Sequence, residues 1–250
     1  MNTPKVLFLY LLLMPLAVVS SQDCLRIALG ENKPPYAITS PPSGIEFDIL
    51  TMVVAGMGMK ADIKFIPNTR ALEMLKYGEL DAAVGNSGEF LSDPYISYEN
   101  VAISLASSKI ELQTITELGN YQIVAFQNAK LYLGAEFAQM AQTNKGYREI
   151  SPQILINRQL YSSRAPVAIS DLNIFLNLNN QLDTSFNIKQ PLKIHRLFSP
   201  TQYRLVFNSP GYREAFNISL KKVVASNPFP ALAQKYLPSG SVITFKPQGM

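Results

Sequence analysis

The chain has 250 residues, which is enough for one large domain or for two smaller lobes. Hydrophobic residues make up 47% and charged residues 16%, and this composition excludes a disordered chain. The formal net charge is +4, but the basic residues are scattered and their densest cluster is Lys221-Lys222. This pattern does not indicate a nucleic-acid partner.

The first 21 residues have the pattern of a cleaved secretory signal. Lys5 supplies a positive charge, and residues 6–19 form an apolar stretch shorter than the roughly 20 residues that span a bilayer. Val19 and Ser21 suit the small-residue positions of a cleavage site. We therefore expect residues 1–21 to be a signal peptide and the mature protein to be periplasmic, with an N-terminal membrane anchor as the alternative.

Cys24 is the only cysteine, so no intramolecular disulfide can form. Asp23 stands before it, where a lipoprotein signal has a small residue, and this argues against a lipid anchor. We expect a half-buried, unmodified thiol at the start of the first strand.

From residue 24 onward, the apolar pattern predicts strands and helices in alternation. In the first part of the mature chain the predicted strands are 24–30, 59–65, 80–84 and 101–105, and the predicted helices are 45–58 and 68–78. The order β-α-β-α-β is typical of a wound, mostly parallel sheet.

The pattern restarts after residues 107–109, which we expect to cross into a second lobe. There the predicted strands are 122–126, 148–150, 167–169 and 194–198, and the predicted helices are 131–142, 153–161 and 171–178. After a second crossing at 199–201 come a strand at 203–207 and helices at 212–225 and 230–237. The fold class expected is α/β with two lobes, each a mostly parallel sheet with helices on both faces.

We place the strand and helices after the second crossing back on the first lobe. The predicted first lobe is therefore discontinuous, covering residues 22–106 and 200–250, and the second lobe covers residues 107–199. Two crossings between two lobes predict a hinged cleft that closes around a ligand.

Ligands in open α/β sheets bind beyond the carboxyl ends of the strands. Residues 127–130 follow one buried strand of the second lobe, and Ser170-Asp171 follow another. In the first lobe the polar loop of residues 85–95 also follows a strand. We expect a small molecule to bind where these segments meet.

Three stretches follow one another along the chain: Pro34-Pro35-Tyr36 with GIEFDI at 44–49, ALEMLKYGELDAAV at 71–84, and residues 164–171. In this order they resemble family 3 of the bacterial extracytoplasmic solute-binding proteins, which serve amino-acid transporters. The resemblance covers about residues 24–237. It implies the type II periplasmic-binding fold, a small polar ligand, and a transporter permease or membrane receptor as partner. We accordingly expect the protein to be a monomer without a cofactor and without catalytic activity.

The resemblance also implies ligand contacts. Tyr36 would line the cleft, and Asp171 would bind the ammonium group of an amino acid. Asn86 and Ser87, with Gly88 beside them, would donate hydrogen bonds to its carboxylate. Tyr36 as ordinary packing, Asp171 as a helix N-cap and residues 86–87 as a plain turn are the structural alternatives.

This sequence departs from the family in the cationic residue that would bind the ligand's carboxylate. The family's carboxylate-binding arginine is missing between Arg70 and Arg148, and Ala129-Lys130 replaces its Gly-Thr pair. A lysine lacks the bidentate geometry of a guanidinium. We expect Lys130, or Arg70, to supply the cation; a solvated lysine and a surface arginine are the alternatives.

Two further functions stay open. A periplasmic dehydratase-like enzyme would need a general acid, and Glu89 is the loop carboxylate that could provide it. A sensor or interaction protein of the same fold would report to a membrane receptor. His195, the only histidine, is expected to be structural, and Glu46 and Asp48 are expected to hold loops rather than a metal.

Overall fold

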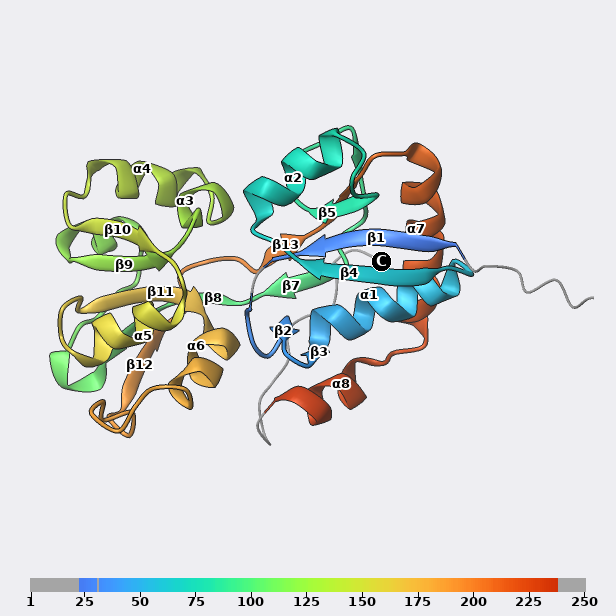
Figure 1. The fold of residues 1–250 in the computed structure, drawn as a ribbon. Coiled ribbons are helices and arrows are strands. Elements are labelled where there is room, and N and C mark those ends of the chain that lie inside the picture. The colour runs from blue at the N-terminus through green and yellow to red at the C-terminus, as the bar shows by residue number, and fades with distance from the viewer. Residues whose placement is uncertain (1–22, 31, 238–250) are drawn as a thin grey trace, which may run out of the picture.

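The computed structural model describes residues 23–30 and 32–237. It consists of two α/β lobes connected by two crossings (Figure 1). The predicted signal peptide, residues 1–21, lies outside the described residues. Within the described ranges, no helix has both the length and the apolar character needed to cross a membrane.

The first lobe contains a five-stranded sheet in the order β4-β1-β5-β14-β6. Its strands are β1 (Cys24–Leu29), β4 (Lys60–Phe65), β5 (Ala82–Val84), β6 (Phe90–Leu91) and β14 (Leu205–Phe207). Strand β1 pairs in parallel with β4 and β5, whereas β14 pairs antiparallel with β5 and β6. Because β14 comes from the C-terminal part of the chain, this lobe is discontinuous. Cys24 is exposed at the start of β1, not half-buried as predicted.

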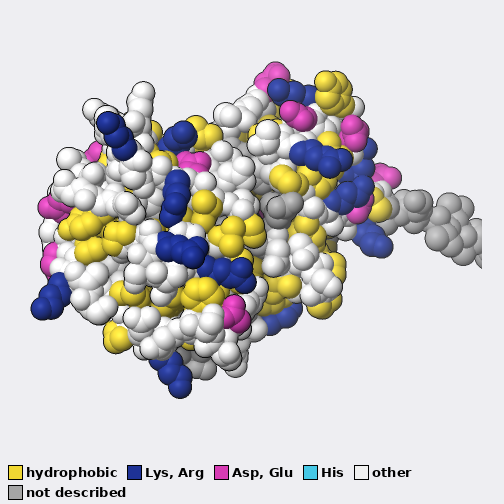
Figure 2. Space-filling view, turned by 60° about the vertical axis from the view of Figure 1, so that its left-hand side comes forward, with side chains coloured by type: hydrophobic (Ala, Val, Ile, Leu, Met, Phe, Trp, Pro, Cys, Tyr) yellow, Lys and Arg dark blue, Asp and Glu magenta, His cyan; other side chains and the backbone are white. Residues whose placement is uncertain are grey.

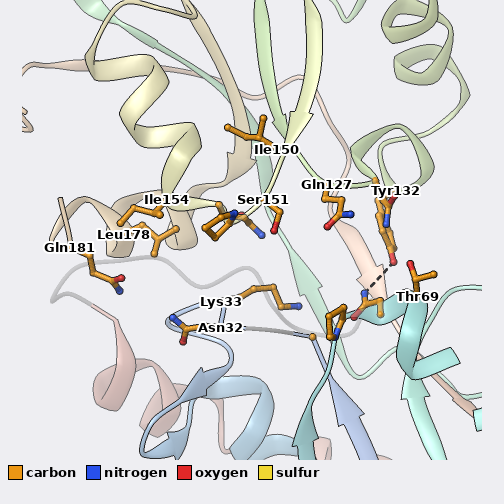
Figure 3. A pocket seen from close by; sticks show the side chains of 16 residues that line it. Asn32, Lys33, Thr69, Gln127, Tyr132, Ile150, Ser151, Ile154, Leu178 and Gln181 are labelled. Atoms are coloured by element: carbon orange, nitrogen blue, oxygen red, sulfur yellow. Dashed lines mark hydrogen bonds between the residues drawn. The ribbon is translucent and has the colours of Figure 1, made fainter. Parts of the chain in front are cut away.

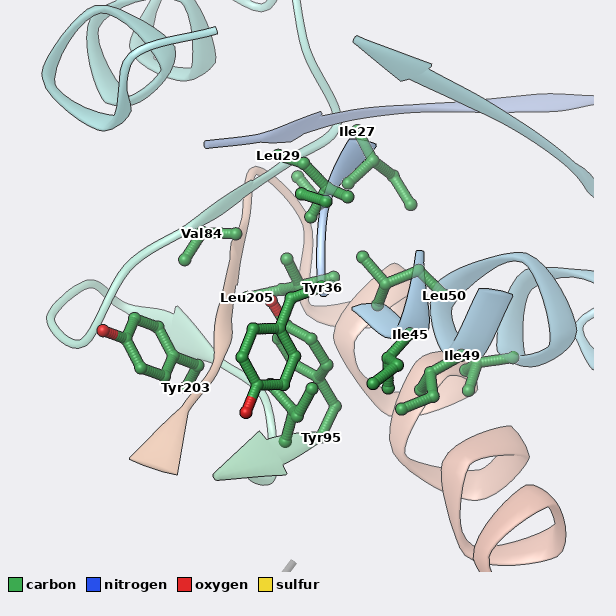
Figure 4. Close-up of a cluster of buried hydrophobic side chains, with 14 of the residues drawn as sticks. Ile27, Leu29, Tyr36, Ile45, Ile49, Leu50, Val84, Tyr95, Tyr203 and Leu205 are labelled. Carbon is green, nitrogen blue, oxygen red and sulfur yellow. The ribbon is translucent and has the colours of Figure 1, made fainter. Parts of the chain in front are cut away.

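Helices cover both faces of this sheet. Alternate residues of β1, such as Leu25 and Ile27, pack toward α1 (Ile45–Gly56), α7 (Pro210–Ala225) and α8 (Phe229–Tyr236) in one core cluster. Ala28 belongs to a smaller cluster on the opposite face, under α2 (Asn68–Lys76). Figure 4 shows the larger cluster, in which tyrosines lie beside aliphatic residues of β1, β14 and α1.

The second lobe contains another five-stranded sheet, in the order β10-β9-β11-β8-β12. Its strands are β8 (Asn100–Leu105), β9 (Ile123–Phe126), β10 (Tyr147–Ile150), β11 (Val167–Asp171) and β12 (Leu192–His195). Its helices are α3 (Ala129–Tyr132), α4 (Ala135–Thr143), α5 (Ile154–Tyr161) and α6 (Leu172–Asn179), with short 3-10 turns η1 (Ala106–Ser108) and η2 (Thr116–Asn120). Strand β9 pairs in parallel with β10 and β11, and β8 pairs antiparallel with β11 and β12.

The two-lobed α/β fold is therefore confirmed, with sheets that are mixed where mostly parallel ones were expected. In both lobes the strands joined by helical crossovers are parallel. The antiparallel pairs involve β8, β12 and β14, which lead into or out of the crossings. A short hairpin of β2 (Ile38–Thr39) and β3 (Pro42–Ser43) precedes α1.

The first crossing lies at Glu99, and its predicted position at residues 107–109 is wrong. β7 (Ile96–Tyr98) pairs with β13 (Thr201–Tyr203) between the lobes, and β8 begins two residues after β7 ends. Residues 100–105 thus belong to the second sheet, although they were assigned to the first lobe. All six are buried, and an apolar run of this kind does not reveal which sheet it joins.

Two other predicted elements are interrupted. The helix expected at 131–142 divides into α3 and α4 at Gly134, whose φ of 91° is outside the helical region. The strand expected at 203–207 is divided between β13 and β14, which pair with different partners. Both breaks lie close to the crossings and to the space between the lobes.

Candidate functional site

The two residues predicted to contact a ligand most directly, Tyr36 and Asp171, contact each other across the lobes. The Tyr36 hydroxyl donates to Asp171 Oδ2 over 3.4 Å and accepts a hydrogen bond of 3.0 Å from Asn173 Nδ2. Each of Tyr36 and Asp171 is only 1% exposed. In this conformation the pair joins the lobes, with neither side chain open to solvent.

Asp171 also has the N-cap role that was predicted as its alternative. Its Oδ1 accepts from Ile174 N at 3.0 Å at the start of α6, and its Oδ2 accepts from Glu99 N at 2.9 Å at the first crossing. Burial raises the pKa of the Asp171 carboxyl to about 7, although the hydrogen bonds from Ile174 N and the Tyr36 hydroxyl and the charge of Lys33 act in the opposite direction. The carboxylate therefore fastens α6, the crossing and the first lobe at one point.

A column of four tyrosine rings continues from this pair. Tyr36 stacks on Tyr98 with 4.1 Å between ring centroids, Tyr98 lies 4.4 Å from Tyr203, and Tyr203 lies 5.6 Å from Tyr132 of α3. Tyr98 and Tyr203 come from the paired strands β7 and β13, whereas Tyr132 belongs to the second lobe. The column thus packs the second lobe against the ribbon that connects the lobes.

Beside this column lies a cavity of about 250 Å³ between the lobes (Figure 3). The first lobe contributes residues that follow β1 and β4, and the second lobe contributes residues that follow β9 and β10 and residues of α6. The described lining residues are Gly30, Asn32, Lys33, Pro67, Asn68, Thr69, Gln127, Asn128, Tyr132, Ile150, Ser151, Pro152, Gln153, Ile154, Leu178 and Gln181. Residues of both lobes line the cavity, so both lobes must be in place to form it.

One bond closes an edge of the cavity. Asn68 Nδ2, at the start of α2, donates to the Tyr132 hydroxyl of α3 over 3.4 Å (Figure 3). Asn68 and Thr69 lie at the N-terminal end of α2, whose first backbone N–H groups have no side-chain cap among the described residues. A polar solute in the cavity would therefore meet amide and hydroxyl groups from both lobes.

Lys33 carries the only charge among the described lining residues. In Figure 3 its side chain extends from the loop after β1 into the space between the lobes. Its Nζ is 3.8 Å from Glu46 Oε2 and lies over the rings of Tyr98 and Tyr203, 5.4 and 5.7 Å from their centroids. Glu46 is fully buried and accepts from the hydroxyls of Tyr95 and Tyr98.

The N-terminal end of α3 is bound by a carboxylate of the protein itself, that of Glu149. Glu149 of β10 accepts from Asn128 N at 2.7 Å and from Lys130 N at 3.2 Å, and its Oε1 also accepts from the Tyr147 hydroxyl at 2.7 Å. Within residues 127–130, which were expected to lie at the ligand site, two backbone N–H groups therefore already bind a carboxylate of the protein. This contact could not be predicted from the sequence, because Glu149 is on a neighbouring strand, 21 residues from Asn128.

The other four predicted contact residues are exposed and are not among the described lining residues of this cavity. Asn86 lines a second, more open groove of about 620 Å³ on the other side of Tyr132, next to residues 197–202. Ser87, Arg70 and the Lys130 ammonium lie outside both spaces. Ligand contact by these four residues, and by Tyr36 and Asp171, stays a prediction.

The remaining polar residues of the sequence analysis have structural partners or lie at the surface. Asp48 accepts hydrogen bonds of 2.8 Å from Lys235 and from the Tyr236 hydroxyl, which attach α8 to α1. Burial lowers the pKa of His195, whose Nε2 is 3.0 Å from Ser104 Oγ between β12 and β8. Glu89 is exposed. The described residues contain no group of three or more His, Cys, Asp or Glu side chains placed to hold a metal ion.

Part of the cavity was predictable and part was missed. Gln127 and Asn128 follow β9, where the strand-end rule placed the ligand. The same rule applied to β1, β4 and β10 would have found Lys33, Asn68 and Ser151, which come after the ends of those strands. Tyr132 gave no signal, because its place depends on the break between α3 and α4.

Comparison with known sequences finds no matching family model and no matching curated protein. Solved structures do match. The GluR0 ligand-binding core in complex with L-glutamate has 14% identity and a TM-score of 0.68, covering 88% of this chain and 100% of that one. A histidine kinase sensor domain with similarity to periplasmic binding proteins has 14% identity and a TM-score of 0.69, covering 85% and 96%.

The arginine-, lysine-, histidine-binding protein of Geobacillus stearothermophilus is similar at the same level. It has 16% identity and a TM-score of 0.68, covering 88% of this chain and 97% of that one. These likenesses extend over both lobes, so they concern the whole described architecture. The chain therefore has the two-lobed type II periplasmic-binding fold that the sequence resemblance implied.

Proposed function

We propose that this chain, which has the fold of the family 3 extracytoplasmic solute-binding proteins, is a periplasmic protein that captures a small polar solute between its lobes. The observation that carries the proposal is the cavity between the lobes, which is lined from both of them. Its lining combines carboxamides, hydroxyls and one ammonium with a few apolar side chains, which is typical of a small-molecule site. The cavity of about 250 Å³ suits a metabolite of amino-acid or organic-acid size.

The proposed partner is a membrane transporter permease, which would receive the solute when the lobes open, and the protein would act as a monomer without catalysis. Lysine and arginine side chains are present on both lobes of the face in Figure 2, interspersed with uncharged side chains. On this face, the distribution supports neither a nucleic-acid interface nor one dominant charged surface. Tyr36 and Asp171 could contact a solute directly only after their mutual contact opens.

The test is ligand-dependent stabilisation. Residues 22–250 would be unfolded and refolded to remove bound solute, then heated with dye detection against a library of small metabolites; the chain has no tryptophan for intrinsic fluorescence. A ligand at about 100 times its dissociation constant adds roughly 2.7 kcal/mol to the free energy of unfolding. The melting temperature should then rise by roughly 5–10 °C.

A cavity-filling variant tests whether the ligand binds within the cavity between the lobes. Ser151→Phe puts a ring into the cavity and should abolish the shift, whereas Ser107→Phe, at an exposed position in η1, should leave it unchanged. Equal shifts in both variants would contradict binding in this cavity. A library without any stabilising compound would count against solute capture itself.

A sensor that reports to a membrane receptor is the second candidate. It is favoured by the likeness to a histidine kinase sensor domain and by the absence of an arginine between Arg70 and Arg148. Cross-linking of the protein in intact cells, followed by identification of the membrane partner, separates the two: a permease supports transport and a receptor supports sensing.

A further inference from the structure

The cavity has an unusual charge for a site that would hold a zwitterion. Among its described lining residues six carry carboxamides, three carry hydroxyls, one carries an ammonium and none carries a carboxylate; the carboxamides are Asn32, Asn68, Gln127, Asn128, Gln153 and Gln181. A ligand ammonium would find only neutral acceptors there and would share the space with the Lys33 ammonium. Like charges in a confined site repel, and a cation without a carboxylate partner is costly to desolvate.

Lys33 is placed to receive an anion. Its side chain is 15% exposed, so the aliphatic part is covered while the ammonium borders the cavity. The 3.8 Å separation from Glu46 is longer than a hydrogen bond, and both oxygens of Glu46 accept from tyrosine hydroxyls. A Cβ atom on Gly30 would lie 3.1 Å from Lys33 Nζ and 3.1 Å from Asn68 Oδ1, which places the ammonium close to the start of α2.

The groups that could hold the two charges of an amino acid are engaged elsewhere. Asp171, the carboxylate predicted to bind an ammonium, is 1% exposed and accepts from Glu99 N, Ile174 N and the Tyr36 hydroxyl. At the start of α3, Glu149 already accepts from the N–H groups of residues 128 and 130. The carboxylate of Asp171 and the N–H groups of residues 128 and 130 are thus already hydrogen-bonded within the protein. In this conformation neither is available to a ligand in the cavity.

We propose that the cavity binds a small organic carboxylate with hydroxyl or carbonyl groups and without an ammonium group, and that Lys33 pairs with its carboxylate. The carboxamides and hydroxyls of both lobes then bind its neutral oxygen atoms. This inference rests on the proposed capture function and specifies its solute. The expected solute is then not an α-amino acid, although the sequence resemblance implied one.

The test compares acids that differ in one group. L-Lactate and L-alanine, L-malate and L-aspartate, and 2-hydroxyglutarate and L-glutamate are pairs in which a hydroxyl replaces an ammonium; putrescine represents a cation without a carboxylate. Binding is measured by calorimetry on the refolded residues 22–250. We expect at least one hydroxy acid to bind at least tenfold more tightly than its amino-acid partner, and putrescine to show no binding.

Variants at Lys33 then test whether its ammonium group binds the carboxylate of the solute. Lys33→Gln should weaken binding of the preferred hydroxy acid about 10- to 100-fold, the range for losing a charge-assisted hydrogen bond. Lys33→Arg should retain part of the affinity, and Lys76→Gln, an exposed lysine at the other end of α2, should retain all of it. Thermal melts of each variant show whether it is folded, and Lys33→Arg keeps the charge beside Glu46 if Lys33→Gln is unstable.

The outcomes separate the two proposals. Tighter binding of an amino acid or of putrescine than of any hydroxy acid would overturn the preference for carboxylates and leave solute capture intact. Equal affinity of the preferred acid for Lys33→Gln and the unmodified protein would remove Lys33 from the site. Failure of every compound in both this series and the metabolite library would count against capture as a whole.

Discussion

The hydroxyl of Tyr36 in the first lobe donates a hydrogen bond to Asp171 in the second lobe, over 3.4 Å, and Asn173 donates to the same hydroxyl over 3.0 Å. The three groups form one link between the lobes at the crossing. Because both Tyr36 and Asp171 are only 1% exposed, opening the lobes must expose or rearrange this link. The stability of the folded protein therefore depends on the state of this single buried carboxyl.

The first prediction concerns pH. The pKa of Asp171 is about 7 in the folded protein, above its ordinary 3.8, because burial disfavours the charged form. The folded protein therefore holds this proton more tightly than the unfolded chain does, and the resulting stability is fully present below about pH 4 and is lost as the pH rises through about 7. The loss is on the order of 4 kcal/mol in the free energy of unfolding.

Urea denaturation from pH 4 to pH 8 measures this dependence, with Asp171→Asn as the comparison. Asparagine keeps an acceptor for Ile174 N but does not titrate in this range. The difference in unfolding free energy between the two proteins should change steadily between pH 4 and pH 7. A constant difference would show that Asp171 keeps an ordinary pKa in the folded protein.

The second prediction concerns the hydroxyl group of Tyr36. Tyr36→Phe keeps the ring and its 4.1 Å stacking on Tyr98 but leaves Asn173 Nδ2 and Asp171 without their shared partner. We expect a loss of about 1–2 kcal/mol in the free energy of unfolding, the scale for leaving buried polar groups unpaired. Tyr77→Phe is the matched control, because Tyr77 is 82% exposed, and it should be neutral. Equal urea midpoints for both variants would mean that the link does not contribute to stability.

The third prediction concerns Glu149 at the start of α3. Its carboxylate accepts from two backbone N–H groups, at 2.7 and 3.2 Å, and from the Tyr147 hydroxyl. Glu149→Gln removes the charge and one acceptor, so we expect about 1–2 kcal/mol of destabilisation. Glu79→Gln, at an exposed residue after α2, should have no effect, and a difference below about 0.5 kcal/mol between the two variants in urea denaturation would contradict the assigned contact.

The sequence predicted the two lobes because hydrophobic periodicity and turn residues mark individual strands and helices clearly. It could not assign residues 100–105 to a sheet, since all six are buried and would suit either one. The resemblance implied that Tyr36 and Asp171 each contact a ligand, but the local pattern could not show that they would bond to each other. Lys33 and Glu149 were missed for a related reason: their roles arise from loops and strands that only the folded chain brings together.

The break between α3 and α4 supplies the last prediction, because it shows where periodicity fails. Residues 131–142 have a helical pattern, yet Gly134 has φ 91° and ψ 171°, a region that is essentially restricted to glycine. A side chain at this position would have no atom within 4 Å, so the cost of Gly134→Ala lies in the backbone conformation and not in a clash. We expect a loss of about 1–3 kcal/mol in urea denaturation.

Gly119→Ala is the control for that experiment. Gly119 lies in η2, where an added Cβ would be 4.0 Å from Met140 Cγ and no positive φ is required, so we expect little change or a slight gain from the stiffer unfolded chain. Because Tyr132 precedes the break and holds the edge of the cavity with Asn68, Gly134→Ala should also weaken solute binding, whereas Gly119→Ala should not. A Gly134→Ala protein as stable as the Gly119→Ala protein would contradict the assigned backbone cost of a side chain at residue 134.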